Sequence, residues 1–115
     1  MSVTIFHNPR CSKSRQTLEL LKSNGVEPNV VEYLKQPPTS DALTIIINKL
    51  GVNVRDIIRH KEAEYKEVGA DNKDLTDAEL IALLVATPKL IERPIVVNGE
   101  KAVVGRPPEN VLDII

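Results

Sequence analysis

The residue best suited to chemistry is the single cysteine, Cys11, which lies within the sequence His-Asn-Pro-Arg-Cys-Ser-Lys-Ser-Arg at positions 7–15. This stretch carries basic side chains at Arg10, Lys13 and Arg15 and no acidic one. Positive charge, together with the unpaired N–H groups of a helix start, stabilises a thiolate relative to the neutral thiol. The sequence therefore predicts a nucleophile at neutral pH. The alternative, a buried structural cysteine, suits an apolar context better than this polar one.

A reactive Cys11 would have to work without a second cysteine. Cys11 and Ser14 have the spacing of a Cys-x-x-Cys redox motif in which serine replaces the second cysteine. Any redox cycle then needs a thiol from another molecule, such as glutathione. A phosphatase-type loop would need an arginine where this chain has Thr17, so that class is disfavoured. One cysteine and two histidines cannot supply a typical structural zinc site without several carboxylates, and no metal is expected.

The elements around Cys11 are predicted to form a β-α-β unit. Residues 3–6 are a short apolar run that Asn8-Pro9 ends, because proline cannot donate to a strand ladder. Leucines at helical spacing predict a helix over residues 11–24. The β-branched and aromatic run 29–34 predicts a second strand, parallel to the first. Cys11 would lie at the junction between the first strand and the helix.

The middle of the chain is predicted to be helical. The apolar positions of residues 40–50 recur at helical spacing between a Thr-Ser cap and a glycine stop. Residues 54–58 suggest a short helical turn, and Thr76 has the capping-box spacing to Glu79 that opens a further helix. The charged stretch 60–75 is either a solvated face or a mobile flap, and the sequence does not decide between them.

The last part of the chain predicts a hairpin and a final helix. Asn98-Gly99 favours the positive φ angles of a tight turn between strands at 95–97 and 102–104. Pro107-Pro108 can open the helix that follows. We expect three residues of that helix to face the core: Val111, Leu112 and Ile115.

This order of elements predicts an α/β, thioredoxin-like fold: a four-stranded mixed sheet flanked by helices, with a helical insertion between strands 2 and 3. A chain of 115 residues is expected to form a single domain over 1–115. A net charge of -1 and 3% aromatic residues favour neither nucleic acid nor membrane as a partner. With no signal-peptide pattern and no long apolar run, we expect a cytoplasmic location.

Four motifs, taken in order, resemble the ArsC-type arsenate reductases linked to glutaredoxin, a thioredoxin-fold family. The motifs span nearly the whole chain and lie at residues 7–15, 54–59, 92–97 and 105–108. The best characterised family members carry Cys-Gly-Thr-Ser-Arg where this chain has Cys-Ser-Lys-Ser-Arg. The difference places Lys13 beside the nucleophile, where its charge favours the thiolate and could alter which anion is preferred.

The resemblance implies a role for each candidate site residue. Cys11 would attack arsenate, His7 would lie near the nucleophile, and Ser14 would support the thiolate by hydrogen bonding. Guanidinium groups suit a tetrahedral oxyanion because their planar forks form charge-assisted hydrogen bonds, although most arginines are simply solvated. The expected substrate-binding arginines are Arg59, Arg93, Arg106 and Arg15.

The implied reaction is reduction of arsenate to arsenite through a covalent Cys11–arsenic adduct. Glutathione would attack this adduct as co-substrate, and glutaredoxin would take over the mixed disulfide, with no bound cofactor. The resemblance also implies a cis peptide bond before Pro94. Two alternatives stay open: a monothiol oxidoreductase of the same fold acting on another substrate, and a non-enzymatic regulator like the Spx proteins, which bind RNA polymerase. Spx proteins usually sense redox state through a Cys-x-x-Cys pair, so Ser14 weighs against the regulator.

Overall fold

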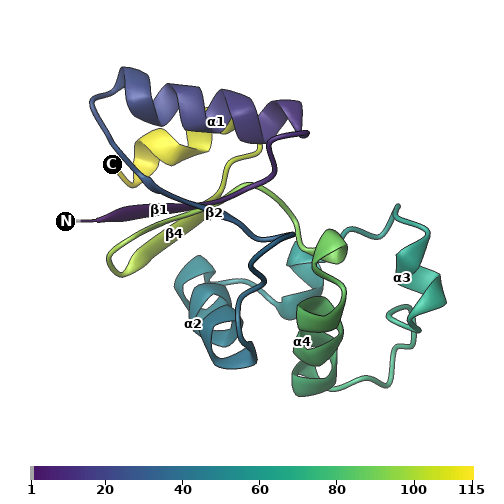
Figure 1. Ribbon diagram of the computed structural model, residues 1–115. Coiled ribbons are helices and arrows are strands. Elements are labelled where there is room, and N and C mark those ends of the chain that lie inside the picture. Colours follow the sequence, from purple (N-terminus) through teal and green to yellow (C-terminus); the bar gives the residue numbers. More distant parts are fainter. Residues whose placement is uncertain (1) are drawn as a thin grey trace. The chain divides into compact units, whose positions relative to one another are not determined.

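The computed structural model describes residues 2–115, and its elements follow the predicted order (Figure 1). The chain falls into two compact units. A sheet unit comprises the residues up to Gln36 together with Arg93–Ile115, and a helical unit comprises Pro37–Glu92. The helical unit is the insertion expected between the second and third strands, and the α/β class is confirmed. A single domain over the whole length stays a prediction.

The sheet unit contains four strands in the order β2-β1-β3-β4. β1 pairs in parallel with β2 and antiparallel with β3, and β3 forms a hairpin with β4. The β-α-β unit and the hairpin are therefore confirmed. The turn lies one residue later than predicted, at Gly99-Glu100: Asn98 is the last residue of its strand and pairs with Lys101, and Gly99 has φ 60° whereas Asn98 has no positive φ. The strand bounds are β1 (Val3–His7), β2 (Asn29–Glu32), β3 (Ile95–Asn98) and β4 (Lys101–Val104).

Two helices cover one face of this sheet and enclose its core. They are α1 (Ser12–Ser23) and the 3₁₀-helix η3 (Pro108–Asp113), which pack against each other (Figure 1). Buried and half-buried residues alternate along β1, and the buried row ends at His7. Because alternate residues of a strand share a face, His7 points to the side covered by α1. The buried cluster on that side consists of Val3, Ile5, Leu21, Val96 and Val111.

The final helix differs from the prediction in type and in the face it buries. η3 is a 3₁₀-helix, in which residues three apart share a face. Val111 is fully buried, and Ile114 packs against the same cluster. Leu112 and Ile115, also three apart, are 45% and 41% exposed. The expectation that these two residues face the core is therefore wrong: Leu112 follows the buried Val111 in a helix with three residues per turn, and Ile115 lies beyond the end of η3 at Asp113.

The second strand is shorter than predicted. β2 ends at Glu32, and the Lys35 N–H donates to the Glu32 carbonyl oxygen over 2.9 Å, which turns the chain. Tyr33 is buried while Leu34 is exposed. The apolar residues therefore extend beyond the end of the strand. Tyr33 lies in the turn, and its side chain packs in the interior.

The helical unit holds three α-helices and two 3₁₀-helices. The Thr39 side chain accepts from the Ala42 N–H at the start of the first helix, and Gly51 ends that helix with φ 69°. The cap and the stop of this helix are as predicted. The elements are α2 (Ser40–Leu50), η1 (Val54–Ile57), α3 (Glu64–Glu67), α4 (Asp77–Ala86) and η2 (Pro88–Leu90). None of the helices within residues 2–115 is long and apolar enough to cross a membrane.

The charged stretch 60–75 is tied to η1 by one arginine. Arg55 donates from Nη1 to the Ala70 carbonyl oxygen over 3.0 Å and from Nη2 to the Asn72 carbonyl oxygen over 2.7 Å. Its Nη1 also lies 3.4 Å from the Tyr65 hydroxyl. The stretch holds the short helix α3, which buries no residue, whereas Ala70 is buried. Arg55 therefore fixes this segment by bonding its backbone.

The capping box at the start of α4 gives a direct test of local stability. Thr76 Oγ1 accepts from the Glu79 N–H, and the Glu79 carboxylate accepts from the Thr76 N–H. Replacing Thr76 with alanine should lower the free energy of unfolding by about 1 kcal/mol, because a helix N–H loses its acceptor. Urea unfolding followed by circular dichroism measures this loss. Thr76→Ser keeps the hydroxyl and should unfold like the wild type; equal losses for both variants would contradict the capping role.

Candidate active site around Cys11

Cys11 lies at the start of α1, immediately after the turn that leaves β1. Its N–H donates to the Asn8 carbonyl oxygen over 3.0 Å, which closes the turn. Its own carbonyl accepts from the Arg15 N–H over 3.0 Å, so Cys11 is the N-cap residue of the helix. The predicted strand-to-helix junction is confirmed, and Cys11 is 9% exposed.

Burial and local polarity act on the Cys11 thiol in opposite directions. Burial raises the pKa of the thiol, because a thiolate loses hydration. Although the Cys11 side chain makes no capping hydrogen bond, the backbone N–H groups of Ser14 and Lys13 lower the pKa, as helix-start donors do for an anion. The charges of Arg93 and Arg106 lower it further. The net effect is a pKa below the ordinary value of a cysteine.

The sheet topology brings the two arginines to Cys11. Phe6 on β1 pairs with Ile95 on β3, and Ile95 pairs with Val104 on β4. The residues just before β3 and just after β4 therefore lie at the end of the sheet where β1 leads toward Cys11. Those residues are Arg93-Pro94 and Gly105-Arg106.

Arg106 is aimed at the sulfur by the backbone of Arg93. Its Nε donates to the Arg93 carbonyl oxygen over 2.8 Å, and its Nη2 lies 3.5 Å from Cys11 Sγ. The Nη2 end of the guanidinium thus approaches the sulfur, while its Nε end is held by the hydrogen bond to Arg93. The Arg93–Pro94 peptide bond is cis, as expected, and the Arg106–Pro107 bond is cis as well.

His7 and Ser14 form a buried pair beside the cysteine. His7 Nδ1 lies 2.6 Å from Ser14 Oγ, and the same oxygen accepts from the Asn8 N–H over 3.0 Å. Ser14 is fully buried and His7 is 6% exposed. The Ser14 hydroxyl therefore ties the turn and the end of β1 to α1. The Ser14 group that lowers the Cys11 pKa is its backbone N–H.

The remaining predicted arginines, Arg15 and Arg59, have other partners. Arg15 Nη1 donates to the Pro9 carbonyl oxygen over 2.9 Å, so this side chain braces the turn before Cys11. Arg59 belongs to the helical unit, where its Nη2 lies 2.8 Å from Glu62 Oε1 in an ion pair. Six of the seven predicted site residues thus belong to the sheet unit: His7, Cys11, Ser14, Arg15, Arg93 and Arg106.

Two residues behind this site have no role predicted from the sequence. Thr17 and Gly105 are both buried, and Thr17 Oγ1 lies 3.3 Å from the Gly105 carbonyl oxygen. The only signal in the sequence was the glycine directly before an arginine and two prolines, at 105–108. Their proximity is a tertiary contact between residues 88 positions apart.

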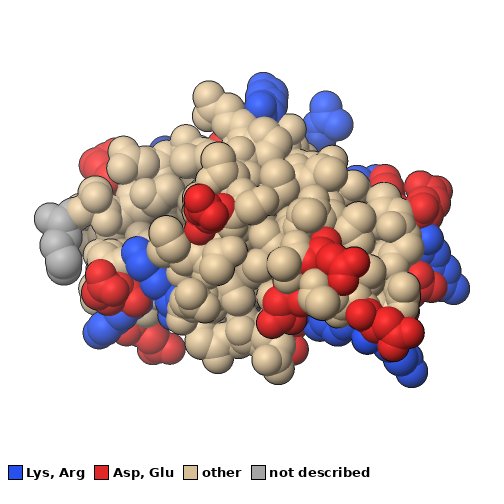
Figure 2. Space-filling view, turned by 90° about the horizontal axis from the view of Figure 1, so that it is seen from below, with Lys and Arg blue, Asp and Glu red and all other residues tan. Residues whose placement is uncertain are grey.

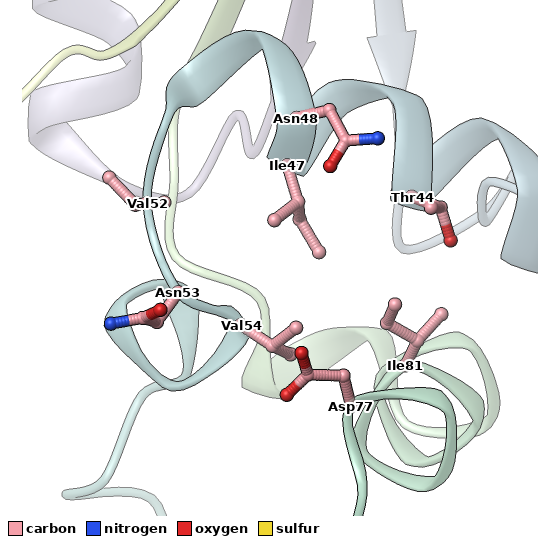
Figure 3. Close-up of a pocket in the computed structure, with 8 residues that line it drawn as sticks. All are labelled: Thr44, Ile47, Asn48, Val52, Asn53, Val54, Asp77 and Ile81. Carbon is pink, nitrogen blue, oxygen red and sulfur yellow. The ribbon is translucent and has the colours of Figure 1, made fainter.

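A pocket in the helical unit has no cysteine, histidine or basic side chain among its lining residues (Figure 3); its polar lining consists of Thr44, Asn48, Asn53 and Asp77. Its volume is about 160 Å³, and Ile47, Val54 and Ile81 form its apolar side. The Thr44 hydroxyl on its rim donates to the Ser40 carbonyl oxygen over 2.8 Å. Within residues 2–115, no group of three or more His, Cys, Asp or Glu residues is placed to hold a metal ion. The cysteine site is therefore the candidate active site.

The face drawn in Figure 2 carries charged side chains of both signs. On the face drawn in Figure 2, Asp and Glu side chains lie close to Lys and Arg side chains at several places. Mixed signs cancel at a distance, whereas polyanion binding needs a sustained basic field. Positive charge matters locally, at Cys11.

Arg106 should control the reactivity of the thiol. Arg106→Gln removes the charge 3.5 Å from Sγ, so the Cys11 pKa should rise and the rate of alkylation by iodoacetamide near pH 7 should fall several-fold. Arg10→Gln is the matched control, because it removes the same charge from an exposed residue adjacent to Cys11 in sequence. Equal effects of the two variants would show that general charge, and not the Arg106 geometry, sets the reactivity.

His7 should make stability depend on pH. Burial lowers the His7 pKa. The negative charge of Glu32 raises the pKa, and the positive charge of Arg15 lowers it further. The unfolded chain therefore binds the proton more readily, and the free energy of unfolding should fall as the pH decreases through the unfolded histidine pKa of about 6.5. Urea unfolding at about pH 7.5 and about pH 5.5 measures this fall. His7→Gln should reduce the difference, and an unchanged difference would contradict the assignment to His7.

Comparison with known proteins places this chain in a family. The model of the ArsC family matches residues 6–114. An arsenate reductase of Haemophilus influenzae is 49% identical over 116 residues, which cover all of both chains. The uncharacterized protein YfgD of Escherichia coli is 53% identical over 114 residues, covering 98% of this chain and 96% of YfgD. The structure of an arsenate reductase from Vibrio cholerae matches with a TM-score of 0.97 and 49% identity, covering 100% of this chain and 98% of that one. The chain described here belongs to the ArsC family.

Proposed function

We propose that this protein reduces arsenate to arsenite with Cys11 as the nucleophile. The observation that carries the proposal is the approach of Arg106 Nη2 to within 3.5 Å of Cys11 Sγ, at a thiol whose pKa is lowered. A thiolate beside a guanidinium combines a nucleophile with a binding group for a tetrahedral oxyanion. The names of the relatives, two of which are arsenate reductases, support the choice of arsenate.

In the proposed first step, the Cys11 thiolate attacks the arsenic atom of arsenate. A sulfur–arsenic bond forms, an arsenic–oxygen bond breaks, and the oxygen leaves as hydroxide, which takes a proton to become water. Arsenic remains in the +5 state. Arg93 and Arg106 would hold the oxyanion and stabilise the charge that develops as hydroxide leaves.

In the proposed second step, the thiolate of glutathione attacks Cys11 Sγ. A sulfur–sulfur bond forms, and the electron pair of the sulfur–arsenic bond stays with arsenic, which leaves as arsenite in the +3 state. The two thiol sulfurs together supply the two electrons. Glutaredoxin then removes glutathione from the mixed disulfide and restores the Cys11 thiol. This cycle needs a reducing compartment, so we propose a cytoplasmic location.

His7 and Ser14 would act in this reaction by holding the turn and helix start that present Cys11. The Ser14 hydroxyl joins His7 to the Asn8 N–H, and the Ser14 backbone N–H favours the thiolate. Arg15 would stabilise the same turn through the Pro9 carbonyl oxygen. A direct substrate contact by Arg59 stays a prediction from family resemblance.

A coupled assay tests the proposal. NADPH consumption should depend on arsenate, glutathione, glutaredoxin and glutathione reductase, and Cys11→Ser should abolish it. Arg93→Ala should lower kcat/KM by roughly tenfold or more, since a charge-assisted hydrogen bond contributes about 1.5–3 kcal/mol. Arg10→Ala, a change of the same charge at an exposed position, should have little effect.

The same assay separates the alternatives. No arsenate-dependent turnover, with Cys11 still rapidly alkylated near neutral pH, would reject arsenate reduction. Faster turnover of a glutathionylated protein than of arsenate would select the monothiol oxidoreductase. Stable association with RNA polymerase and no turnover of either substrate would select the regulator.

A further inference from the structure

The helix that carries Cys11 is joined to the loop that carries Arg106 at one buried threonine. Thr17 on α1 is fully buried. Its Oγ1 lies 2.8 Å from the Lys13 carbonyl oxygen and 3.3 Å from the Gly105 carbonyl oxygen. A hydroxyl has one proton, so the two carbonyls share a single donor. The second bond links α1 to the residue directly before Arg106.

Gly105 is packed too tightly at this point to carry a side chain. A Cβ atom there would lie 2.7 Å from Thr17 Oγ1 and 3.0 Å from Thr17 Cγ2. On the other side it would lie 2.9 Å from Pro94 Cγ, and the Gly105 N–H donates to the Pro94 carbonyl oxygen over 2.9 Å. The backbone of Gly105 is therefore held between α1 and the residue that precedes β3.

The contact between Thr17 and Gly105 lies one residue away from Arg106, whose guanidinium approaches the sulfur of Cys11. Arg106 Nη2 lies 3.5 Å from Cys11 Sγ. A shift of a few tenths of an ångström in the backbone of Gly105 would move the guanidinium relative to the sulfur. Because Coulomb attraction and hydrogen bonding both weaken with distance, a shift that lengthens this separation would make the thiolate less favourable.

We propose that Thr17 is a positioning residue, and that its contact with Gly105, backed by Pro94, sets the distance between Arg106 and Cys11. Thr17 acts through Arg106, and the structure gives its side chain no contact with the sulfur. The proposal rests on the proposed function only in treating Cys11 as the reacting group. It concerns the reactivity of the thiol, which can be measured without arsenate.

The test is the pH dependence of Cys11 alkylation by iodoacetamide in the full chain. Cys11 is the single cysteine, so the rate reports on it alone. Gly105→Ala should slow alkylation near pH 7 by roughly three- to tenfold and move the pH profile upward, because a displaced Arg106 stabilises the thiolate less. Thr17→Val keeps the shape and loses the donor, so it should move the profile in the same direction. Thr17→Ser keeps the hydroxyl and should stay close to the wild type.

A matched control and a double variant separate positioning from general damage. Thr44 on α2 makes the same kind of bond to a carbonyl four residues earlier but is exposed, so Thr44→Val should leave the profile unchanged. In Thr17→Ala/Gly105→Ala, the new methyl group meets a smaller side chain at position 17. The double variant should therefore recover part of the rate lost in Gly105→Ala.

The outcomes decide the proposal in each case. Wild-type pH profiles in folded Gly105→Ala and Thr17→Val would overturn it, even if both variants melted at lower temperature. If Gly105→Ala does not fold, a shifted profile for Thr17→Val with a normal one for Thr17→Ser supports the proposal, and equal profiles for the two overturn it. Failure of the wild type to reduce arsenate, with these shifts intact, would refute the proposed function and leave the positioning role standing.

Discussion

The site depends on keeping a thiolate favourable in a place where burial opposes it. Cys11 is almost fully enclosed, and loss of hydration alone would make its thiol less acidic. The N–H groups at the start of α1 and two guanidinium groups reverse that effect. The first contribution comes from the local helix, and the second requires the far end of the chain. The fold therefore has to bring residues 93 and 106 to residue 11.

The antiparallel strands meet this requirement. β3 runs back along β1, and the tight turn at Gly99-Glu100 returns β4 alongside β3. Both arginines consequently emerge at the end of the sheet that faces the cysteine. Each is followed by proline, and the backbone of Arg93 accepts the Arg106 side chain. The segments before β3 and after β4 are thus joined by a hydrogen bond, and the arginine of each segment favours the thiolate.

The polar groups around the cysteine divide into those that carry charge and those that hold the frame. Arg93 and Arg106 supply charge. His7, Ser14 and Thr17 are buried and are engaged with backbone groups or with one another. A buried polar side chain without such bonds would destabilise the fold. Their hydrogen bonds therefore also fix the turn, the helix start and the loop.

By itself, the sequence determined the local features of this protein. Strand alternation, helical spacing and the Thr39 and Thr76 caps depend on neighbouring residues, and they specified the order of elements and the place of Cys11 at a helix start. The Asn98-Gly99 signal found the hairpin and missed the turn by one residue. The predictions failed where the helix type or the length of a strand depends on packing. Leu112, for example, is exposed because the final helix is a 3₁₀-helix. Only the tertiary structure decided which charges act on the sulfur. Residues near Cys11 in sequence, such as Arg15, bond to the turn, whereas Arg106 arrives through strand pairing, and no local pattern encodes that distance.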